Sequence, residues 1–206
     1  MDEDRLRIDW LTMDGIAPPP DDEGSDESSH RLGLTILPGK HGASTRYPGR
    51  IYRRDLGRDL ADLSTQGVGR MLLLVEDMEL ERWGDPRIVE RAAERGVEIL
   101  RHPMPDGGVP ASLAEMDTIL AELRAGLARC SVAVACMGGV GRTGMVAACA
   151  LVAGGLRPEE AIAQVRSVRH PEAVETEQQR SFVHAYAAHV TATGRSPRLR
   201  PVSERS

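Results

Sequence analysis

The run from Ser131 to Ala153 (SVAVACMGGVGRTGMVAACALVA) constrains the fold more than any other part of this chain. It starts as a short apolar strand, and it ends with the length and apolar content of a buried helix. Between the two lie Gly138, Gly139 and Gly141, which let the backbone turn tightly and point successive N–H groups inward. A strand, a glycine-rich loop and a helix in this order are typical of anion-binding sites in α/β proteins. This segment therefore predicts both a fold class and a kind of ligand.

The rest of the chain alternates apolar, strand-like runs with longer stretches of helical spacing. Several helical stretches open with a proline or an acidic residue and stop at a glycine, as helices do. The pattern predicts a three-layer α/β fold, with a mainly parallel central sheet flanked by helices. The predicted strands are Leu34–Leu37, Met71–Val75, Val97–Leu100 and Val132–Ala135, and the predicted helices are Leu56–Thr65, Pro86–Arg95, Ser112–Ala128, Thr143–Ala153, Pro158–Val168 and Glu175–Thr191.

The chain length of 206 residues fits one compact domain with additional tails. Residues 1–30 form a predicted N-terminal segment, in which Pro18–Ser29 (PPPDDEGSDESS) is an acidic linker rich in proline and serine. Such a run cannot bury apolar surface, so we expect it to be flexible. We place the folded domain at residues 31–192 and a flexible basic tail, which contains RSPRLRP, at residues 193–206.

Charge and composition exclude several classes of partner. The net charge of −5 and the isoelectric point near 5.7 argue against a general nucleic-acid surface. No apolar run approaches the length of a membrane span, and the first residues, MDEDRLRIDW, are acidic where a secretory leader would be basic. We therefore expect a cytoplasmic protein that binds neither nucleic acid nor membrane, and a monomer. An odd count of cysteines in such a protein predicts free thiols.

Cys136 stands at the junction between the predicted strand and the loop. A cysteine that faces a helix N-terminus and an arginine loses its proton more readily than a free thiol, which makes it a nucleophile. Arg142 lies six positions later, where its planar guanidinium can bind two oxygens of a phosphoryl group. The predicted phosphate-binding residues are Met137, Gly138, Gly139, Val140, Gly141 and Arg142. The alternative is that Cys136 is a buried structural thiol before a glycine turn.

The loop CMGGVGRTG resembles the signature of the cysteine-based protein tyrosine and dual-specificity phosphatases. Three further segments look like the branch typified by the cyclin-dependent-kinase-associated phosphatase: LGLTILPGK (32–40), HPMPDGGVP (102–110) and AVETEQQRSF (173–182). Together they span about residues 30 to 190. The resemblance implies a phosphatase-type α/β fold and hydrolysis of phosphotyrosine, with phosphoserine or phosphothreonine, through a phosphocysteine intermediate. It implies a phosphorylated protein as partner and neither a cofactor nor a metal.

The resemblance also implies roles for three further residues. Asp106, thirty positions before Cys136 (136 − 106), matches the general acid that protonates the leaving group. Thr143 matches the hydroxyl that bonds the cysteine sulfur as phosphocysteine breaks down. Gln179 matches the glutamine that positions the hydrolytic water, although Gln178 beside it is an alternative. Without the loop, Asp106 would be interpreted as an ordinary turn residue.

One residue departs from the family pattern. Ala135 precedes Cys136 at a position where the family usually has a histidine that braces the loop and supports the thiolate. The departure predicts that bracing comes from elsewhere, and it favours a slower enzyme.

Three other readings stay open: a phosphatase acting on a phosphoinositide or an RNA 5′-phosphate, a phosphate-binding module without turnover, and a sulfurtransferase. The loop contains no lysine, which argues mildly against a highly charged substrate. The charged residues along Met78–Arg95 are interpreted as an exposed amphipathic face and carry no functional prediction.

Overall fold

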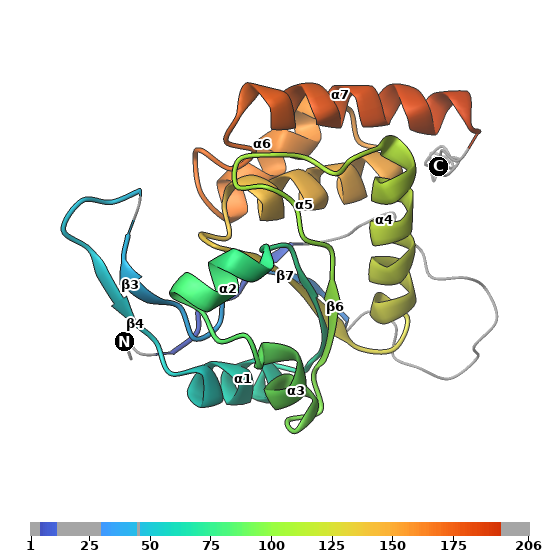
Figure 1. Cartoon of the computed structure of the whole chain (residues 1–206). Helices are drawn as coiled ribbons and strands as arrows, with labels where there is room; N and C mark the ends of the chain where they lie inside the picture. Colours follow the sequence, from blue (N-terminus) through green and yellow to red (C-terminus); the bar gives the residue numbers. More distant parts are fainter. Residues whose placement is uncertain (1–4, 12–29, 45, 195–206) are drawn as a thin grey trace, which may run out of the picture.

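The computed structural model of the chain describes residues 5–11, 30–44 and 46–194. The predicted linker at 18–29 and the tail from residue 195 onward lie outside these residues. A five-stranded sheet in the order β1-β2-β7-β5-β6 forms the centre of the fold (Figure 1). Strands β2, β7, β5 and β6 are parallel, and only β1 runs antiparallel. The predicted mainly parallel α/β sheet is therefore confirmed.

The described part of the chain contains the following elements in order: β1 (Asp9–Leu11), β2 (Leu32–Ile36), β3 (His41–Ala43), β4 (Ile51–Arg53), α1 (Leu56–Thr65), β5 (Val68–Leu73), α2 (Asp77–Trp83), α3 (Ile88–Ala93), β6 (Glu98–Arg101), α4 (Leu113–Leu127), β7 (Ser131–Cys136), α5 (Gly141–Ala153), α6 (Pro158–Val168) and α7 (Glu177–Ala192).

Helices cover both faces of the sheet. Helices α1 and α3 pack on one face, whereas α4 and α5 pack on the other, with α6 and α7 lying outside α5 (Figure 1). Strand β7 occupies the middle of the sheet, and all six of its residues are buried. Helix α5 follows it and is buried from Gly141 to Val152, which agrees with its almost uninterrupted apolar sequence. The segment with the strongest sequence signal thus forms the centre of the molecule.

The boundaries of several elements differ from those predicted. Helices α1 and α6 have the predicted limits, but the predicted helix Pro86–Arg95 is only Ile88–Ala93, and α2 precedes it. In addition, Leu6, Ile8 and Leu11 are buried in the core, and β1 pairs with β2. Residues that the sequence analysis placed before the domain therefore contribute to its sheet.

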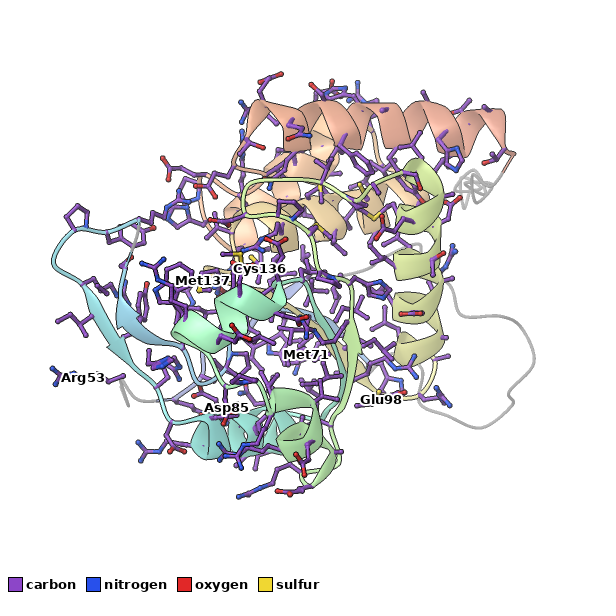
Figure 2. The ribbon with its side chains drawn as sticks, viewed as in Figure 1. Arg53, Met71, Asp85, Glu98, Cys136 and Met137 are labelled. Carbon is purple, nitrogen blue, oxygen red and sulfur yellow. The ribbon has the colours of Figure 1, made fainter. Side chains whose placement is uncertain are left out.

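Strands β3 and β4 form a separate two-stranded hairpin that projects from the body of the protein (Figure 1). Arg53 lies on its outer side, while Cys136 and Met137 lie at the end of the central sheet near α2 (Figure 2). The base of the hairpin is tied to the domain by an ion pair between Arg54 and the buried Asp59 of α1. Because Asp59 also accepts a hydrogen bond from the Gly39 amide, α1 fixes the turn that enters the hairpin. No helix in the described ranges combines the length and hydropathy that crossing a bilayer requires.

Candidate active site

The glycine-rich loop joins the carboxyl end of β7 to the start of α5. Gly139 has φ of 65°, a left-handed conformation that suits glycine, and a Cβ placed there would lie 2.3 Å from the Thr35 carbonyl oxygen. The neighbouring Gly138 has open space, with no heavy atom nearer to such a Cβ than 4.0 Å. The loop therefore passes close to β2 at Gly139 and leads directly into the first turn of α5.

Cys136, Arg142 and Asp106 line one cavity of about 370 Å³ above the loop. The side chains come from different elements: Cys136 ends β7, Arg142 lies in the first turn of α5, and Asp106 lies in the turn that follows β6. Cys136 is only 3 % exposed, whereas the side chain of Asp106 is 75 % exposed. The structure thus brings together the three residues that the sequence predicted as nucleophile, phosphate clamp and acid.

Arg142 is the largest of the fully buried side chains, and its guanidinium is held from several sides. Its Nη1 donates to Glu79 at 2.6 Å and to the Met104 carbonyl at 3.0 Å, and its Nη2 donates to Glu79 at 2.7 Å and to Asp106 at 2.9 Å. Burial opposes the charge, but the hydrogen bonds to Glu79 and the electrostatic interactions with Cys136, Glu79 and Asp106 outweigh it and raise the pKa of Arg142. The guanidinium is therefore a fixed cation at the wall of the cavity.

Glu79 is a site residue that the sequence analysis missed. It is 5 % exposed, and besides binding Arg142 it accepts a hydrogen bond from the Glu76 amide in the capping box of α2. The interpretation of Met78–Arg95 as an exposed face is therefore wrong at this position, because the first turn of α2 directs one carboxylate into the protein. The capping-box spacing of Glu76 and Glu79 was the available signal.

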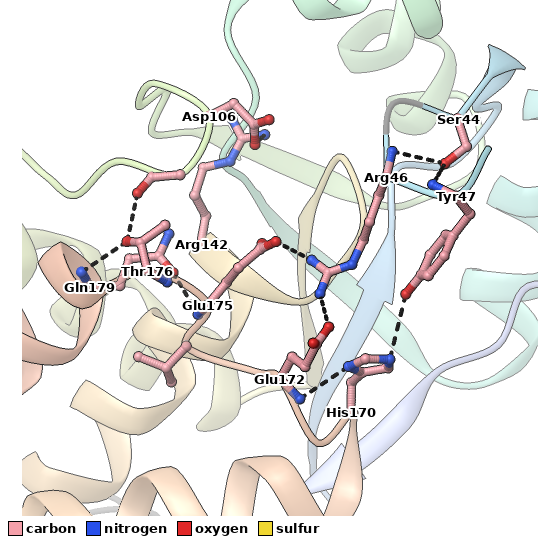
Figure 3. Close-up of polar contacts among 12 residues, drawn as sticks. Ser44, Arg46, Tyr47, Asp106, Arg142, His170, Glu172, Glu175, Thr176 and Gln179 are labelled. Carbon is pink, nitrogen blue, oxygen red and sulfur yellow. Dashed lines mark hydrogen bonds and ion pairs between the residues drawn. The ribbon is translucent and has the colours of Figure 1, made fainter.

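The turn that carries Asp106 is attached to the start of α7. Thr176 donates its hydroxyl to the Gly107 carbonyl at 2.9 Å, and the Gln179 side-chain amide donates to the Gly108 carbonyl at 3.1 Å. Gln179 also accepts the Glu175 amide at 2.9 Å, and it is fully buried against Gly141 (Figure 3). In this structure Gln179 holds the acid turn and the first turn of α5 in place.

Glu175, rather than Gln179, is the member of this segment that lines the cavity. Its carboxylate pairs with Arg46 of the hairpin, and Glu172 pairs with the same guanidinium (Figure 3). Tyr47 approaches His170 beside these ion pairs, at 3.5 Å between Oη and Nε2. The hairpin and the segment before α7 thus meet at one side of the cavity.

Two cations bind carbonyl groups of the loop and brace it, as expected when the usual histidine is missing. Lys40 Nζ donates to the Met137 carbonyl at 3.1 Å. Arg169 donates to the carbonyls of Gly138, at 3.2 Å, and Gly139, at 2.8 Å, and it pairs with Asp9 of β1 at 2.6 Å. Three successive loop carbonyls are therefore held by side chains from distant parts of the sequence.

Lys40 is 6 % exposed and stands over the ring of Tyr52, with Nζ 4.0 Å from the ring centroid. The pKa of Lys40 is lowered to about 8, chiefly by burial and also by the charge of Arg50, while Cys136, Asp106 and Glu79 act in the opposite direction. At neutral pH this amine still carries its proton, so it adds positive charge beside the loop.

The remaining predicted residues have simple environments. The hydroxyl of Thr143 is buried and has no hydrogen-bond partner among the described residues, so the predicted bond to Cys136 is not formed here. Cys149 is fully buried in α5, and burial strongly raises its pKa. Cys130 directly precedes β7 and Cys136 ends it, so the strand separates the two thiols.

Comparison with known proteins gives a consistent result. The family model described as cyclin-dependent kinase inhibitor 3 (CDKN3) matches residues 22–162. Curated proteins named cyclin-dependent kinase inhibitor 3 from rat and human are each 27 % identical to this chain. The rat protein matches over 88 % of this chain and 78 % of its own length, and the human protein over 91 % of this chain and 83 % of its own length.

Solved structures agree with these relatives. A kinase associated phosphatase (KAP), crystallised with its catalytic cysteine replaced by serine, matches with a TM-score of 0.77 at 26 % identity, over 93 % of this chain and 99 % of that one. Tk-PTP in its active form matches with a TM-score of 0.62 at 28 % identity, over 78 % of this chain and 93 % of that one. PTPMT1 in complex with PI(5)P shares the fold, with a TM-score of 0.60 at 20 % identity, over 79 % of this chain and 94 % of that one.

Proposed function

Since this chain belongs to the cyclin-dependent kinase inhibitor 3 family, we propose that it is a cysteine-dependent protein phosphatase that acts through a phosphocysteine intermediate. The chain is related to phosphatases of the same fold, among them one whose catalytic residue is a cysteine. The observation that carries the proposal is the meeting of Cys136, Arg142 and Asp106 in one cavity above an anion-binding loop. A purely structural thiol would need neither the buried arginine nor the acid.

In the first step, the Cys136 thiolate attacks phosphorus while the loop amides and Arg142 bind the phosphoryl oxygens. The S–P bond forms as the bond to the leaving oxygen breaks, and Asp106 gives that oxygen its proton. Asp106 now accepts a hydrogen bond from Nη2 of Arg142. A bound phosphoryl group would take over this donor and free Asp106 for proton transfer.

In the second step, water attacks the phosphocysteine and Asp106, now a carboxylate, accepts its proton. Thr143 lies directly after Arg142, and its unpartnered hydroxyl is available to stabilise the departing thiolate. Gln179 contributes by holding the acid turn through Gly108, which assigns it a positioning role in place of the predicted contact with water. Neither step requires a metal or cofactor.

The substrate class we propose is a phosphorylated protein, with phosphotyrosine accepted and phosphoserine or phosphothreonine accepted as well. Two of the few aromatic residues, Tyr47 and Tyr52, line the cavity from the hairpin, and most of its other lining residues are charged or polar. Since the described residues that line the cavity include no further aromatic side chain to select for a phenol ring, we expect the entrance to accept shorter phosphorylated side chains too.

The test is hydrolysis of a small aryl phosphate by wild type, Cys136→Ser and Asp106→Ala proteins in the presence of a chelator. We expect activity in the wild type, loss of at least a thousandfold in Cys136→Ser, and a loss in Asp106→Ala that grows as the leaving group becomes more basic. If the wild type shows no turnover, the protein is instead a phosphate-binding module without catalytic activity. Full activity of Cys136→Ser would refute the mechanism.

A further inference from the structure

The cavity above the loop is more basic than binding of one phosphoryl group requires. Eight of its lining residues are arginine or lysine and two are acidic. Most of these cations already have carboxylate partners: Arg142 pairs with Glu79, Arg54 with Asp59, and Arg169 with Asp9. The hairpin cation Arg46 is held by two glutamates outside the loop (Figure 3). The remaining charge is concentrated at one place.

Among the cations that line the cavity, Lys40 and Arg50 form no ion pair with a carboxylate of the described residues. They flank the same aromatic ring: Lys40 Nζ lies 4.0 Å and Arg50 Cζ 4.9 Å from the centroid of Tyr52. The charge on Arg50 lowers the pKa of Lys40, so the two groups are close enough to repel each other. Two like charges brought together beside a cavity, one of them almost fully buried, are stabilised when an anion binds between or above them.

We propose that Lys40, Arg50 and Tyr52 form a subsite for a second anionic group of the substrate, beside the phosphoryl group that occupies the loop. This inference rests on the proposed phosphatase function and names its substrate class. The second group is a phosphate or carboxylate on a residue next to the phosphorylated residue of a peptide. Lys40 sets the distance between the two anions, because its ammonium group is bonded to the Met137 carbonyl, one residue after Cys136.

The hairpin itself favours a peptide over a phosphorylated polyol. Tyr47 is 38 % exposed and lines the cavity from the same hairpin that carries Arg50 and Tyr52. An exposed aromatic side chain next to a basic subsite gives the apolar parts of a polypeptide a surface to contact. A small, uniformly charged ligand would make no use of it. The cations that the loop sequence lacks are thus supplied by a segment about ninety residues earlier in the chain (136 − 50).

The experiment compares a singly phosphorylated tyrosine peptide that has neutral neighbours with two matched peptides. One carries glutamate beside the phosphotyrosine, and the other carries a second phosphorylated residue there. The ratio of kcat/KM between anionic and neutral peptides is measured for wild type, Arg50→Ala and Arg53→Ala. Arg53 is the control, because it lies on the same hairpin but outside the cavity (Figure 2). Affinities of the same peptides for the Cys136→Ser protein give an independent measure.

We expect the wild type to prefer the anionic peptides about tenfold in kcat/KM and in affinity, which is the effect of one charge-assisted contact. The ratio between anionic and neutral peptides falls to about one in Arg50→Ala and stays at the wild-type value in Arg53→Ala. In the wild type the ratio decreases at high salt. Equal values for all three peptides in the wild type would overturn the subsite, as would an unchanged preference in Arg50→Ala. Preference for an inositol bisphosphate over a monophosphate, with none among the peptides, would overturn the peptide assignment.

Failure of the phosphatase function itself gives a different result. In that case the wild type hydrolyses none of the peptides and no aryl phosphate, whereas the affinity ratio of the Cys136→Ser protein still decides whether the subsite exists.

Discussion

At the scale of single residues, the site depends on charges that are buried and paired across long sequence separations. Glu79 and Arg142 are 63 positions apart, yet they share two short hydrogen bonds in the interior. Removing one partner of such a pair leaves an uncompensated buried charge, which costs more than the pair contributes. The orientation of Arg142 is therefore set by a residue that does not line the cavity.

Substitution of Glu79 tests this dependence. We expect Glu79→Gln to lower the free energy of unfolding by about 3 kcal/mol and to lower kcat for an aryl phosphate about a hundredfold, because the clamp loses its alignment. Urea denaturation and steady-state kinetics measure the two effects. Glu81→Gln is the matched control, since Glu81 lies on the same helix but is exposed, and it should resemble wild type. Equal behaviour of the two variants would contradict the role of Glu79.

The lowered pKa of Lys40 predicts a specific pH dependence of stability. Its pKa is about 8 in the folded protein and 10.5 in the unfolded chain, so between these values the unfolded state binds more protons. The contribution of Lys40 to the free energy of unfolding therefore rises from pH 8 to 10.5, and it is constant below pH 8, where both states are protonated. The difference in unfolding free energy between wild type and Lys40→Met should increase over that window. A flat difference would show that the amine has its ordinary pKa.

At the scale of elements, the loop between β7 and α5 requires glycine at one position and not at its neighbour. Gly139→Ala places a methyl group against the Thr35 carbonyl in a left-handed conformation, whereas Gly138→Ala meets open space. We expect Gly139→Ala to lose about 2–4 kcal/mol of stability, the sum of backbone strain and overpacking. Gly138→Ala should stay within about 0.5 kcal/mol of wild type. Calorimetric or urea unfolding of the two variants makes the comparison, and equal losses would refute it.

Elements with long periodic or apolar signals could be predicted from the sequence, whereas short ones could not. Helices α1, α4, α5, α6 and α7 and the four parallel strands were all expected within a few residues. The three-residue strands β1, β3 and β4 carry too few side chains to show a period, and their pairing depends on partners elsewhere in the chain. Helix α2 was missed for a similar reason, because its seven residues bury only two side chains.

The candidate site divides in the same way. Cys136 and Arg142 could be predicted from the sequence because the loop is contiguous, and Asp106 could be predicted because its segment resembles that of the phosphatases. Lys40, Glu79 and Arg169 could not, because their importance arises from folding, which brings three distant segments against the loop. Gln179 was predicted in a relevant segment, but its side chain bonds to the Gly108 carbonyl in the turn that carries Asp106. Glu175 is the residue of this segment that lines the cavity.

At the scale of the whole molecule, the parallel sheet places Cys136, the proposed nucleophile, where its strands end and where helices on both faces can supply partners. Strand β7 presents Cys136 from the centre of the sheet, α2 supplies Glu79 from one side, and the start of α7 holds the acid turn from the other. The β3–β4 hairpin adds the basic wall of the cavity. The loop is thus braced without a histidine at position 135, because Lys40 and Arg169 bind its carbonyls.

The most direct test of the central claim is to trap the covalent intermediate. The Asp106→Ala variant retains the nucleophile and the clamp but lacks the base for the second step, so it should accumulate phosphoenzyme when an aryl phosphate with a good leaving group is supplied. After acid quenching, mass spectrometry of the proteolysed protein should place one phosphate on Cys136 and none in the Cys136→Ser, Asp106→Ala double variant. If the wild type hydrolyses the substrate but the quenched Asp106→Ala variant carries no phosphate on Cys136, the account is contradicted.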